Sequence, residues 1–320
     1  MNSCQATYHT TSVQNMDWIE IEKCPLCLSA SSKHLIDINK KGYIFGKECI
    51  LIPSSRISIQ ECCRCGLAYK TTIPSKPFLS EVYERQVENI WTSPYTFEAE
   101  IELVKQLFPS ASFDLLDVGA STGELLRQCS QFSGRRSALD IVRYPGTAKY
   151  INGEIILSLL DQEHIKWSEE SYDLVTVFDV LEHLYDPQIA FENLLDFTNP
   201  EGLIVIETGN IKSYKTNSGN MMFWPYVSLF EHHIFWQKKS IEYAAELYKL
   251  EIVEWRLKKH KKNYYHSNLT RLKSFLKFVS YKTSPSLYFR LMNMLISGTH
   301  EPPGNPLSKD HLRVVFKKKK

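Results

Sequence analysis

The middle of the chain alternates short apolar runs with helical patterns, and each apolar run ends in a glycine or an acid. Runs of this length, separated by amphipathic stretches, predict strands of a parallel sheet joined by helices. Two later runs predict the last strands of the same sheet. We therefore expect an α/β fold with a doubly wound, Rossmann-like sheet. The predicted strands lie within 113–118, 137–140, 172–178, 202–208, 249–256 and 312–316.

The first run leads directly into a glycine turn. The sequence Phe-Asp-Leu-Leu-Asp-Val-Gly-Ala-Ser-Thr-Gly fills 113–123, and a helical pattern begins at Glu124. Gly119 and Gly123 permit a sharp turn and a close approach of ligand to backbone, while the helix offers unpaired N–H groups. The turn is a candidate ligand-binding loop, although its spacing is not that of the dinucleotide motif Gly-x-Gly-x-x-Gly.

Acids end the next two runs. Asp140 lies 23 residues after Asp117, at the end of the second predicted strand. A carboxylate at this position can accept hydrogen bonds from both hydroxyls of a ribose. A solvated acid that closes an edge turn is the alternative interpretation. Asp179 and the pair Glu182-His183 follow the third run, at the edge where open α/β sheets bind ligands.

These ordered motifs resemble those of the class I S-adenosylmethionine-dependent methyltransferases over Leu115 to Asn210. The resemblance implies a methyltransferase sheet that binds the cofactor through the glycine loop. Ser121 stands where the family usually has a middle glycine. If its φ is negative, a serine at this position costs little conformational energy. Asp140 is implied at the ribose, Asp161 at the adenine amino group and Asp179 at the amino-acid end, while Asp117 is expected to brace the loop. The implied loop contacts are Gly119, Ala120, Ser121 and Gly123.

Four of the eight cysteines form two Cys-x-x-Cys pairs, Cys24 with Cys27 and Cys62 with Cys65. Two such pairs supply the four thiolates of a tetrahedral zinc site, and closed four-sulfur sites are usually structural. The spacing of two residues favours Cys62 with Cys65 over the neighbouring Cys63. Disulfides and ordinary buried thiols are the alternatives, and we expect reduced thiols because no signal peptide precedes them.

The sequence around the second pair, Cys-Gly-Leu-Ala-Tyr, and the later Phe-Leu-Ser-Glu-Val-Tyr extend the resemblance. Together they look like the amino-terminal zinc ribbon of a bacterial methyltransferase subgroup associated with sugar and surface-polysaccharide biosynthesis. Sugar C-methyltransferases belong to that subgroup. This resemblance implies a saccharide-related acceptor.

The chain is therefore predicted to have a small amino-terminal domain, a main domain and one insertion. Its net charge of +2 and pI near 8.0 do not require a nucleic-acid partner, and we interpret its lysine runs as solvated ends. No apolar stretch is long enough to span a membrane, so a cytoplasmic protein is expected. The predicted units are a tail at 1–17, a zinc ribbon at 18–73, connecting helices at 74–111, a methyltransferase domain at 112–258 with 310–320, and a helical insertion at 259–309.

Two segments are candidates for the acceptor side. Phe230 to Trp236 resembles the Tyr-His-Glu-His segment of sugar C-methyltransferases, in which the Glu and His handle acceptor protons. Only Glu231 and His232 match that segment. His183 is a second candidate base, and an ordinary polar loop or a packed histidine is the alternative in each case.

We therefore predict methyl transfer from S-adenosylmethionine to a small polar acceptor such as a sugar, a nucleotide sugar or a related metabolite, with O-methylation favoured. An RNA or nucleotide methyltransferase is one alternative. A catalytically silent scaffold is the other, suggested by Ser121. A homo-oligomer is compatible with all three.

Overall fold

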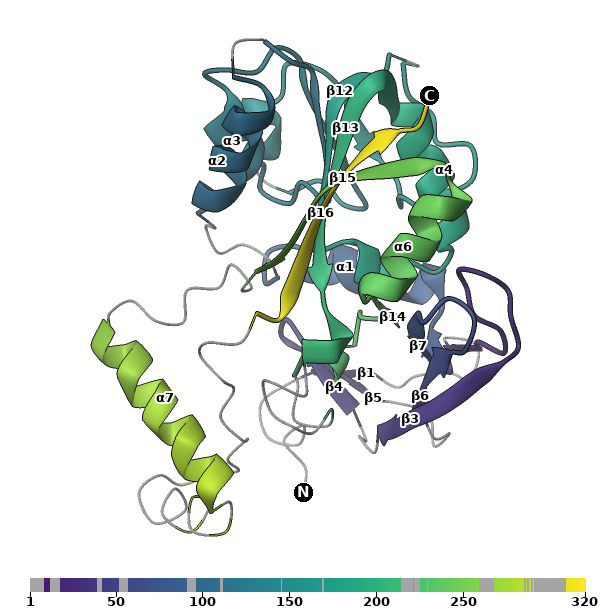
Figure 1. Cartoon of the computed structure of the whole chain (residues 1–320), viewed down its shortest axis with the longest axis vertical. Helices are drawn as coiled ribbons and strands as arrows, with labels where there is room; N and C mark the ends of the chain where they lie inside the picture. The colour runs from purple at the N-terminus through teal and green to yellow at the C-terminus, as the bar shows by residue number, and fades with distance from the viewer. Residues whose placement is uncertain are drawn as a thin grey trace.

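The computed structural model in Figure 1 places a large twisted sheet above a group of smaller sheets. The first belongs to the main domain, and the second to the amino-terminal region. The structure describes residues 9–11, 18–38, 42–51, 57–90, 96–109, 112–144, 146–168, 170–213, 221, 225–228, 230–258, 268–284, 286, 288, 290 and 309–320.

The large sheet has seven strands in the order β11-β10-β9-β12-β13-β16-β15. The first five are parallel, and β16 is antiparallel to both of its neighbours. This order confirms the predicted Rossmann-like, mostly parallel sheet. The strands are β9 (Leu115–Val118), β10 (Arg136–Asp140), β11 (Ile155–Leu157), β12 (Tyr172–Phe178), β13 (Thr198–Gly209), β15 (Leu250–Lys258) and β16 (His311–Lys318).

Strand β13 begins earlier than its apolar run predicts. Its register with β12 shifts between the pairs Tyr172↔Thr198 and Leu174↔Leu203. The sequence Pro-Glu-Gly at 200–202, which is typical of a turn before a strand, therefore lies inside β13 as an irregularity. A bulge admits Pro200 because this residue needs no ladder N–H there.

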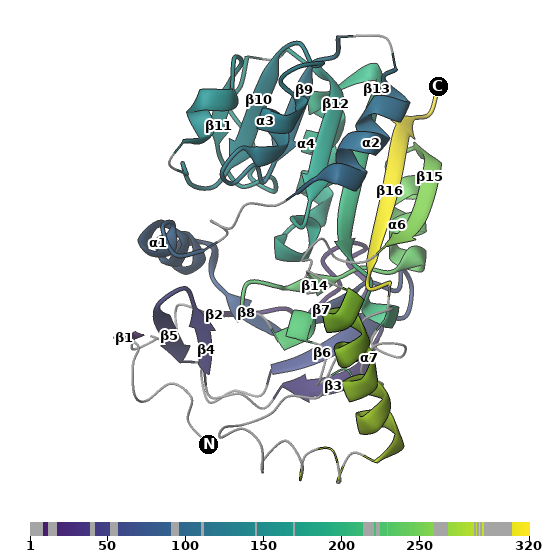
Figure 2. The same ribbon diagram turned by 90° about the vertical axis from the view of Figure 1, so that its left-hand side faces the viewer.

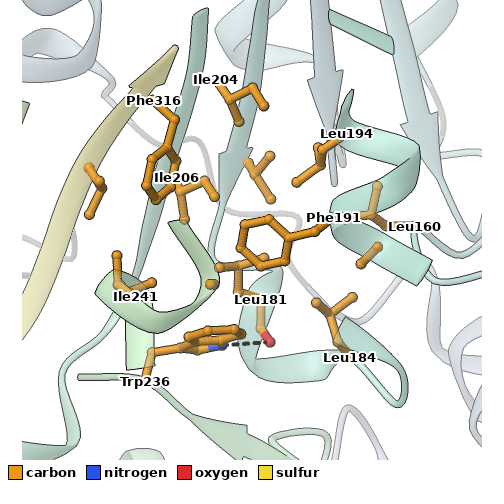
Figure 3. Packing of buried hydrophobic residues seen from close by; sticks show 14 of the residues in the cluster. Leu160, Leu181, Leu184, Phe191, Leu194, Ile204, Ile206, Trp236, Ile241 and Phe316 are labelled. Carbon is orange, nitrogen blue, oxygen red and sulfur yellow. Dashed lines mark hydrogen bonds between the residues drawn. The ribbon is translucent and has the colours of Figure 1, made fainter. Parts of the chain in front are cut away.

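Helices cover both faces of the sheet, as a doubly wound fold requires. One apolar cluster joins the sheet to α4 and α6, and another joins it to α2 and α3. Figure 3 shows Phe191 and Leu194 of α4 facing Ile204, Ile206 and Phe316 across the first of these clusters. The helices are α2 (Glu98–Leu107), α3 (Glu124–Cys129), α4 (Pro187–Phe197) and α6 (Lys238–Leu247), with the 3₁₀ turns η2 (Thr147–Tyr150), η3 (Leu181–His183), η4 (Ile211–Ser213) and η6 (Pro225–Ser228).

The amino-terminal region forms three small sheets and one helix. Its largest sheet, β14-β7-β6-β3, takes β14 from the segment between β13 and α6 of the main domain. The second sheet contains β1, so part of the segment predicted as a tail is a paired strand. The elements are β1 (His9–Thr11), β2 (Trp18–Glu20), β3 (Ser32–Ile38), β4 (Gly42–Phe45), β5 (Glu48–Leu51), β6 (Ile57–Cys62), β7 (Ala68–Lys70), β8 (Thr72–Pro74), α1 (Lys76–Gln86) and β14 (Ile234–Phe235).

A buried ion cluster ties α2 to the far edge of the sheet. Lys258 contacts both Glu100 and Glu207, and Arg313 contacts the same two acids. The two carboxylate side chains are 1–2% exposed. Lys258, which belongs to one of the lysine runs interpreted as solvated, is instead a partly buried partner of two buried acids.

The predicted helical insertion contains α7 (Asn268–Thr283). Figure 1 shows this helix apart from both domains. Among the described residues, no helix combines the length and apolar character needed to cross a membrane.

Candidate functional site

The candidate residues gather where the parallel strands end. Strands β9, β10, β12 and β13 are parallel, so their carboxyl ends meet at one edge. Figure 2 shows that this edge faces α1 and the amino-terminal strands. A crevice outside the carboxyl ends of the strands is where open α/β sheets bind ligands.

The glycine loop after β9 has three residues in the left-handed region. Gly119 and Gly123 each have a φ of 74°, and Ser121 has a φ of 47°. We expected serine to cost little stability at position 121 only if its φ were negative. Its φ is positive, and a residue with a Cβ is strained in this region. A Cβ at Gly119 would collide with Cγ2 of Val180, which explains the glycine there.

Hydrogen bonds hold Ser121 on both sides of its strained backbone. Its N–H donates to Oδ2 of Asp140 at 2.8 Å, and its carbonyl accepts from the Thr147 hydroxyl at 2.7 Å. Thr147 also donates to the Tyr144 carbonyl at 3.1 Å. The loop is thus fixed from β10 and from η2 before any ligand arrives.

Asp140 keeps acceptor capacity for a ligand. Burial raises the pKa of Asp140 to about 6, although the N–H groups of Ser121 and Val142 favour the carboxylate. The nearby Tyr144 hydroxyl is buried and has no hydrogen-bond partner among the described residues. A ligand with hydroxyls and acceptor atoms would satisfy both groups, so these residues fit the ribose end of S-adenosylmethionine.

Asp117 lies behind the loop rather than at its surface. It is 5% exposed, and its Oδ1 accepts from the Thr176 hydroxyl at 2.7 Å. This bond joins β9 to β12 directly below the loop. The geometry agrees with the expected bracing role.

The Asp161 side chain already has several protein partners. Its Oδ2 accepts from the N–H groups of Tyr185 at 2.6 Å and Asp186 at 2.8 Å, and Oδ1 lies 3.5 Å from Nζ of Lys76. The carboxylate therefore ties α1 to the start of α4. If Asp161 also contacts the adenine amino group as predicted, its carboxylate must accept that hydrogen bond in addition to the bonds from the protein.

Asp179 stands immediately after β12 with a φ of 56°. Its Oδ1 lies 3.4 Å from Nε2 of His311. Burial acts to lower the pKa of His311, but Asp179 and Asp310 outweigh it and raise the value to about 9. A charged imidazolium thus pairs with Asp179 on the β16 side of the strand ends.

The three predicted catalytic residues come together, and Glu182 joins them. Glu182 is 1% exposed and accepts from the Thr208 hydroxyl at 2.7 Å, with its other oxygen 4.0 Å from Nε2 of His232. The rings of His183 and His232 lie 4.8 Å apart. Glu231 contributes its carbonyl, 3.0 Å from Nδ1 of His183.

Burial disfavours the charged form of the histidines in this cluster. Nδ1 of His232 lies 2.9 Å from the Tyr226 carbonyl, so that nitrogen carries the proton and Nε2 carries the lone pair. Burial lowers the pKa of His232 well below its usual value and also lowers that of His183. One ligand atom from each of Glu182, His183 and His232 lies within 4.8 Å of the others, so this chemistry suits proton transfer or a divalent cation.

The amino-terminal sheet carries part of this cluster. Ile234 and Phe235 of β14 pair with Tyr69 and Ala68 of β7, and the Lys70 N–H donates to the His233 carbonyl at 2.9 Å. The His233 N–H in turn donates to the Glu182 carbonyl at 2.8 Å. The segment with Glu231 and His232 is therefore held between the amino-terminal sheet and η3.

The four predicted zinc ligands are also brought together. Cys24 Sγ lies 3.5 Å from Cys65 Sγ, and Cys27 Sγ lies 3.4 Å from Cys62 Sγ. Tetrahedral ligands at the usual zinc–sulfur distance are about 3.8 Å apart, so the set is compatible with a zinc site. Cys63 is exposed and lies outside the set.

Several residues of the site belong to none of the motifs found in the sequence. Thr147, Thr208 and Tyr226 are in this group; the Tyr226 hydroxyl accepts from the Gly209 N–H at 2.8 Å. By composition, the aromatic residues around the segment 230–236 suit either stacking on a sugar ring or a hydrophobic lid; of these, Phe235 and Trp236 are fully buried. Trp236 donates to the Leu181 carbonyl at 3.1 Å within the core (Figure 3). Tyr214, Phe223 and Trp224 lie outside the described residues.

A family model described as a methyltransferase domain matches residues 83–254. The chain belongs to the methyltransferase domain family. This match confirms the predicted enzyme class, and with the strand order it confirms the methyltransferase fold.

Two curated relatives of this methyltransferase act on different acceptors. A ubiquinone biosynthesis O-methyltransferase from Hydrogenovibrio crunogenus is 26% identical over 36% of this chain and 50% of its own length. A tRNA U34 carboxymethyltransferase from Aliarcobacter butzleri is 20% identical over 43% of this chain and 46% of its own. The chain thus spans about half the length of the curated relatives it matches.

Structures of methyltransferases with bound S-adenosylhomocysteine are also similar. The N-methyltransferase NodS from Bradyrhizobium japonicum has a TM-score of 0.45 at 15% identity, covering 75% of this chain and 98% of its own. The 1,6-didemethyltoxoflavin-N1-methyltransferase from Burkholderia thailandensis has a TM-score of 0.48 at 10% identity, covering 76% and 88%. Because both scores are below 0.5, the fold assignment rests on the family match and the strand order.

Proposed function

We propose that this methyltransferase transfers a methyl group from S-adenosylmethionine to a hydroxyl of a small polar acceptor, of the sugar, nucleotide-sugar or related saccharide class. The observation that carries the proposal is the buried cluster of Glu182, His183 and His232 on the strand edge that also carries the glycine loop. A hydroxyl acceptor must lose its proton during transfer, and this cluster offers a base where the proton would be released.

The cofactor supplies an electrophilic methyl group on a sulfonium when it is bound. The glycine loop and Asp140 would hold it by its amino-acid and ribose ends, as the fit of Ser121, Asp140 and Tyr144 suggests. In-line attack needs both substrates fixed in a dry site, which contributes more than any single functional group.

His232 is the proposed general base. Its Nε2 carries the lone pair because Nδ1 donates to the Tyr226 carbonyl, and burial lowers its pKa, which favours the neutral imidazole before reaction. After it takes a proton, Glu182 at 4.0 Å would stabilise the imidazolium. His183, fixed through the Glu231 carbonyl, would position the acceptor hydroxyl.

We further propose that Cys24, Cys27, Cys62 and Cys65 bind a structural zinc ion. The two short sulfur–sulfur distances and the burial of three of the four thiols support this assignment. Each pair is closed by a left-handed residue four positions after its first cysteine, Leu28 at a φ of 56° and Gly66 at 78°. The two turns therefore have the same form, as the two halves of a ribbon site do.

Calorimetry with S-adenosylmethionine and S-adenosylhomocysteine tests the first requirement. Binding of either by the zinc-loaded chain would justify a screen of nucleotide sugars, followed by RNA. His232→Ala should then lower kcat on the order of 10²-fold or more without changing cofactor affinity, and His34→Ala, which removes an exposed histidine of the ribbon, should leave kcat unchanged. Failure to bind either cofactor form would favour a silent scaffold, and turnover of RNA alone would replace the saccharide acceptor.

A further inference from the structure

Helix α7 exposes an apolar stripe. Leu272, Leu276 and Val279 are 53%, 57% and 39% exposed, and Phe275 is partly exposed between them. These four residues stand at positions i, i+3, i+4 and i+7, which is the spacing of one helix face. Soluble surfaces seldom gather large apolar side chains in this way without a binding role.

One residue of the opposite face is buried. Tyr281 is 8% exposed, and its ring lies 5.7 Å from that of Tyr288. Lys282 Nζ lies 5.7 Å from the ring of Phe278, beside the stripe. The helix thus packs through Tyr281, while its apolar stripe stays exposed.

The charge around the stripe has a single sign. No acidic residue occurs from Trp255 to His300, while this stretch contains ten lysines and arginines. Lys273, Lys277 and Lys282 of the helix are exposed. Lys273 and Lys282 flank the apolar stripe on its two sides, because they are displaced by about 100° and 80° around the helix from Leu272.

We propose that α7 binds an anionic lipid surface, with its apolar stripe in the interface and its lysines at the headgroups. This is the pattern of interfacial helices, which combine Leu and Phe on one face with Lys and Arg beside it. Lysine-flanked helices gain about 1 kcal/mol per basic residue near an anionic bilayer. Nucleic acid would use the lysines but leave Leu272 and Leu276 in water.

A second copy of the chain is a poorer partner for the stripe. The described helix carries Arg271, Lys273, Lys277 and Lys282 and no acid, so two such helices would face each other with like charge. Anionic headgroups supply the charge that this segment lacks. The helix is too short and too charged to span a bilayer, so it would lie in the plane of the surface.

Co-sedimentation of the full chain with vesicles tests this proposal. Vesicles of equal parts phosphatidylglycerol and phosphatidylcholine should bind the chain, and pure phosphatidylcholine should bind it at least about tenfold less. The double variant Leu272→Ser, Leu276→Ser should lose about tenfold or more of the binding to anionic vesicles. The matched control Leu247→Ser, Val253→Ser removes two side chains of similar exposure, 48% and 51%, and should bind as the unmodified chain does.

Because the two leucines are exposed, the double variant should keep its melting temperature. Equal binding by both variants would overturn the proposal, as would equal binding to the two kinds of vesicle or no binding to either. Two other results would replace it: a dimer that the leucine variant abolishes would assign the stripe to a second copy, and binding of RNA without vesicle binding would assign the lysines to nucleic acid.

Discussion

Oδ2 of Asp140 accepts a hydrogen bond from the backbone N–H of Ser121 at 2.8 Å, so the carboxylate that we propose as the ribose ligand also fixes the glycine loop. The bond stabilises a backbone conformation that serine seldom adopts. Loss of the Asp140 carboxylate should therefore affect the loop and the ligand together.

Asp140→Ala should weaken S-adenosylmethionine binding by about 2 kcal/mol or more, because it removes charged acceptors of ribose hydroxyls. Calorimetry at pH 7.5 measures the change. Glu201→Ala, a substitution of an exposed acid far from the loop, is the control. Unchanged affinity in the Asp140 variant would mean that another residue holds the ribose.

The raised pKa of Asp140 predicts a pH dependence with opposite signs for binding and stability. Cofactor binding needs the carboxylate, so affinity should increase as pH rises through about 6. The fold itself favours the protonated acid, so between the unfolded value of 3.8 and about 6 the contribution of Asp140 to the unfolding free energy should decrease as pH rises. Titrations of affinity and of urea midpoints on the unmodified chain and on Asp140→Asn would test this, since the asparagine variant should lose both steps.

Ser121→Gly should stabilise the protein by about 1 kcal/mol, because glycine adopts a φ of 47° without strain. Ser130→Gly provides the comparison, since Ser130 has a φ of −59° and ends the next helix. That substitution should destabilise the protein. Urea unfolding measures both, and a less stable Ser121 variant would show that the serine hydroxyl outweighs the backbone strain.

Glu207→Ala should destabilise the fold by about 3–5 kcal/mol, because it leaves the buried Arg313 and the partly buried Lys258 with less compensating charge. Glu201→Ala removes an acid that pairs with Lys317 and Lys320 at the surface, and little change in stability is expected. Chemical denaturation compares the two. Equal effects would indicate that the buried cluster is not stabilising.

Replacing Cys24 and Cys27 together by serine should release one zinc equivalent and unfold the ribbon. Elemental analysis of the purified chain measures the metal, and Cys63→Ser should retain it because Cys63 is exposed and outside the ligand set. Zinc that persisted at one equivalent in the double variant would have to occupy another site.

The central sheet could be predicted because its strands are buried on both faces and read as continuous apolar runs. Strand β12 has the predicted bounds of 172–178, and the acids at the strand ends follow from the same pattern. The bulge in β13 could not be predicted from the sequence, since it depends on the pairing of β13 with β12 rather than on local composition.

The candidate site was predicted less completely than the sheet. Residues in motifs, such as Asp140 and His232, were recognisable, but their partners Thr147 and Tyr226 were not, because a single hydroxyl or carbonyl acquires its role only from the fold. The left-handed φ of Ser121 was likewise invisible to composition. The position of Lys258 in a run of lysines predicts a solvated side chain. Its contacts with Glu100 of α2 and Glu207 of β13 depend on the fold and could not be predicted from the sequence.

Under the proposed role of His232, the pairing of β14 with β7 connects the amino-terminal sheet to the choice of acceptor. Because one hydrogen-bonded ladder joins Tyr69 to the segment that carries His232, a shift in either would displace the other. An exchange of the methyltransferase sheet between related enzymes should therefore keep cofactor use but not acceptor preference. Acceptor preference should be inherited with the ribbon.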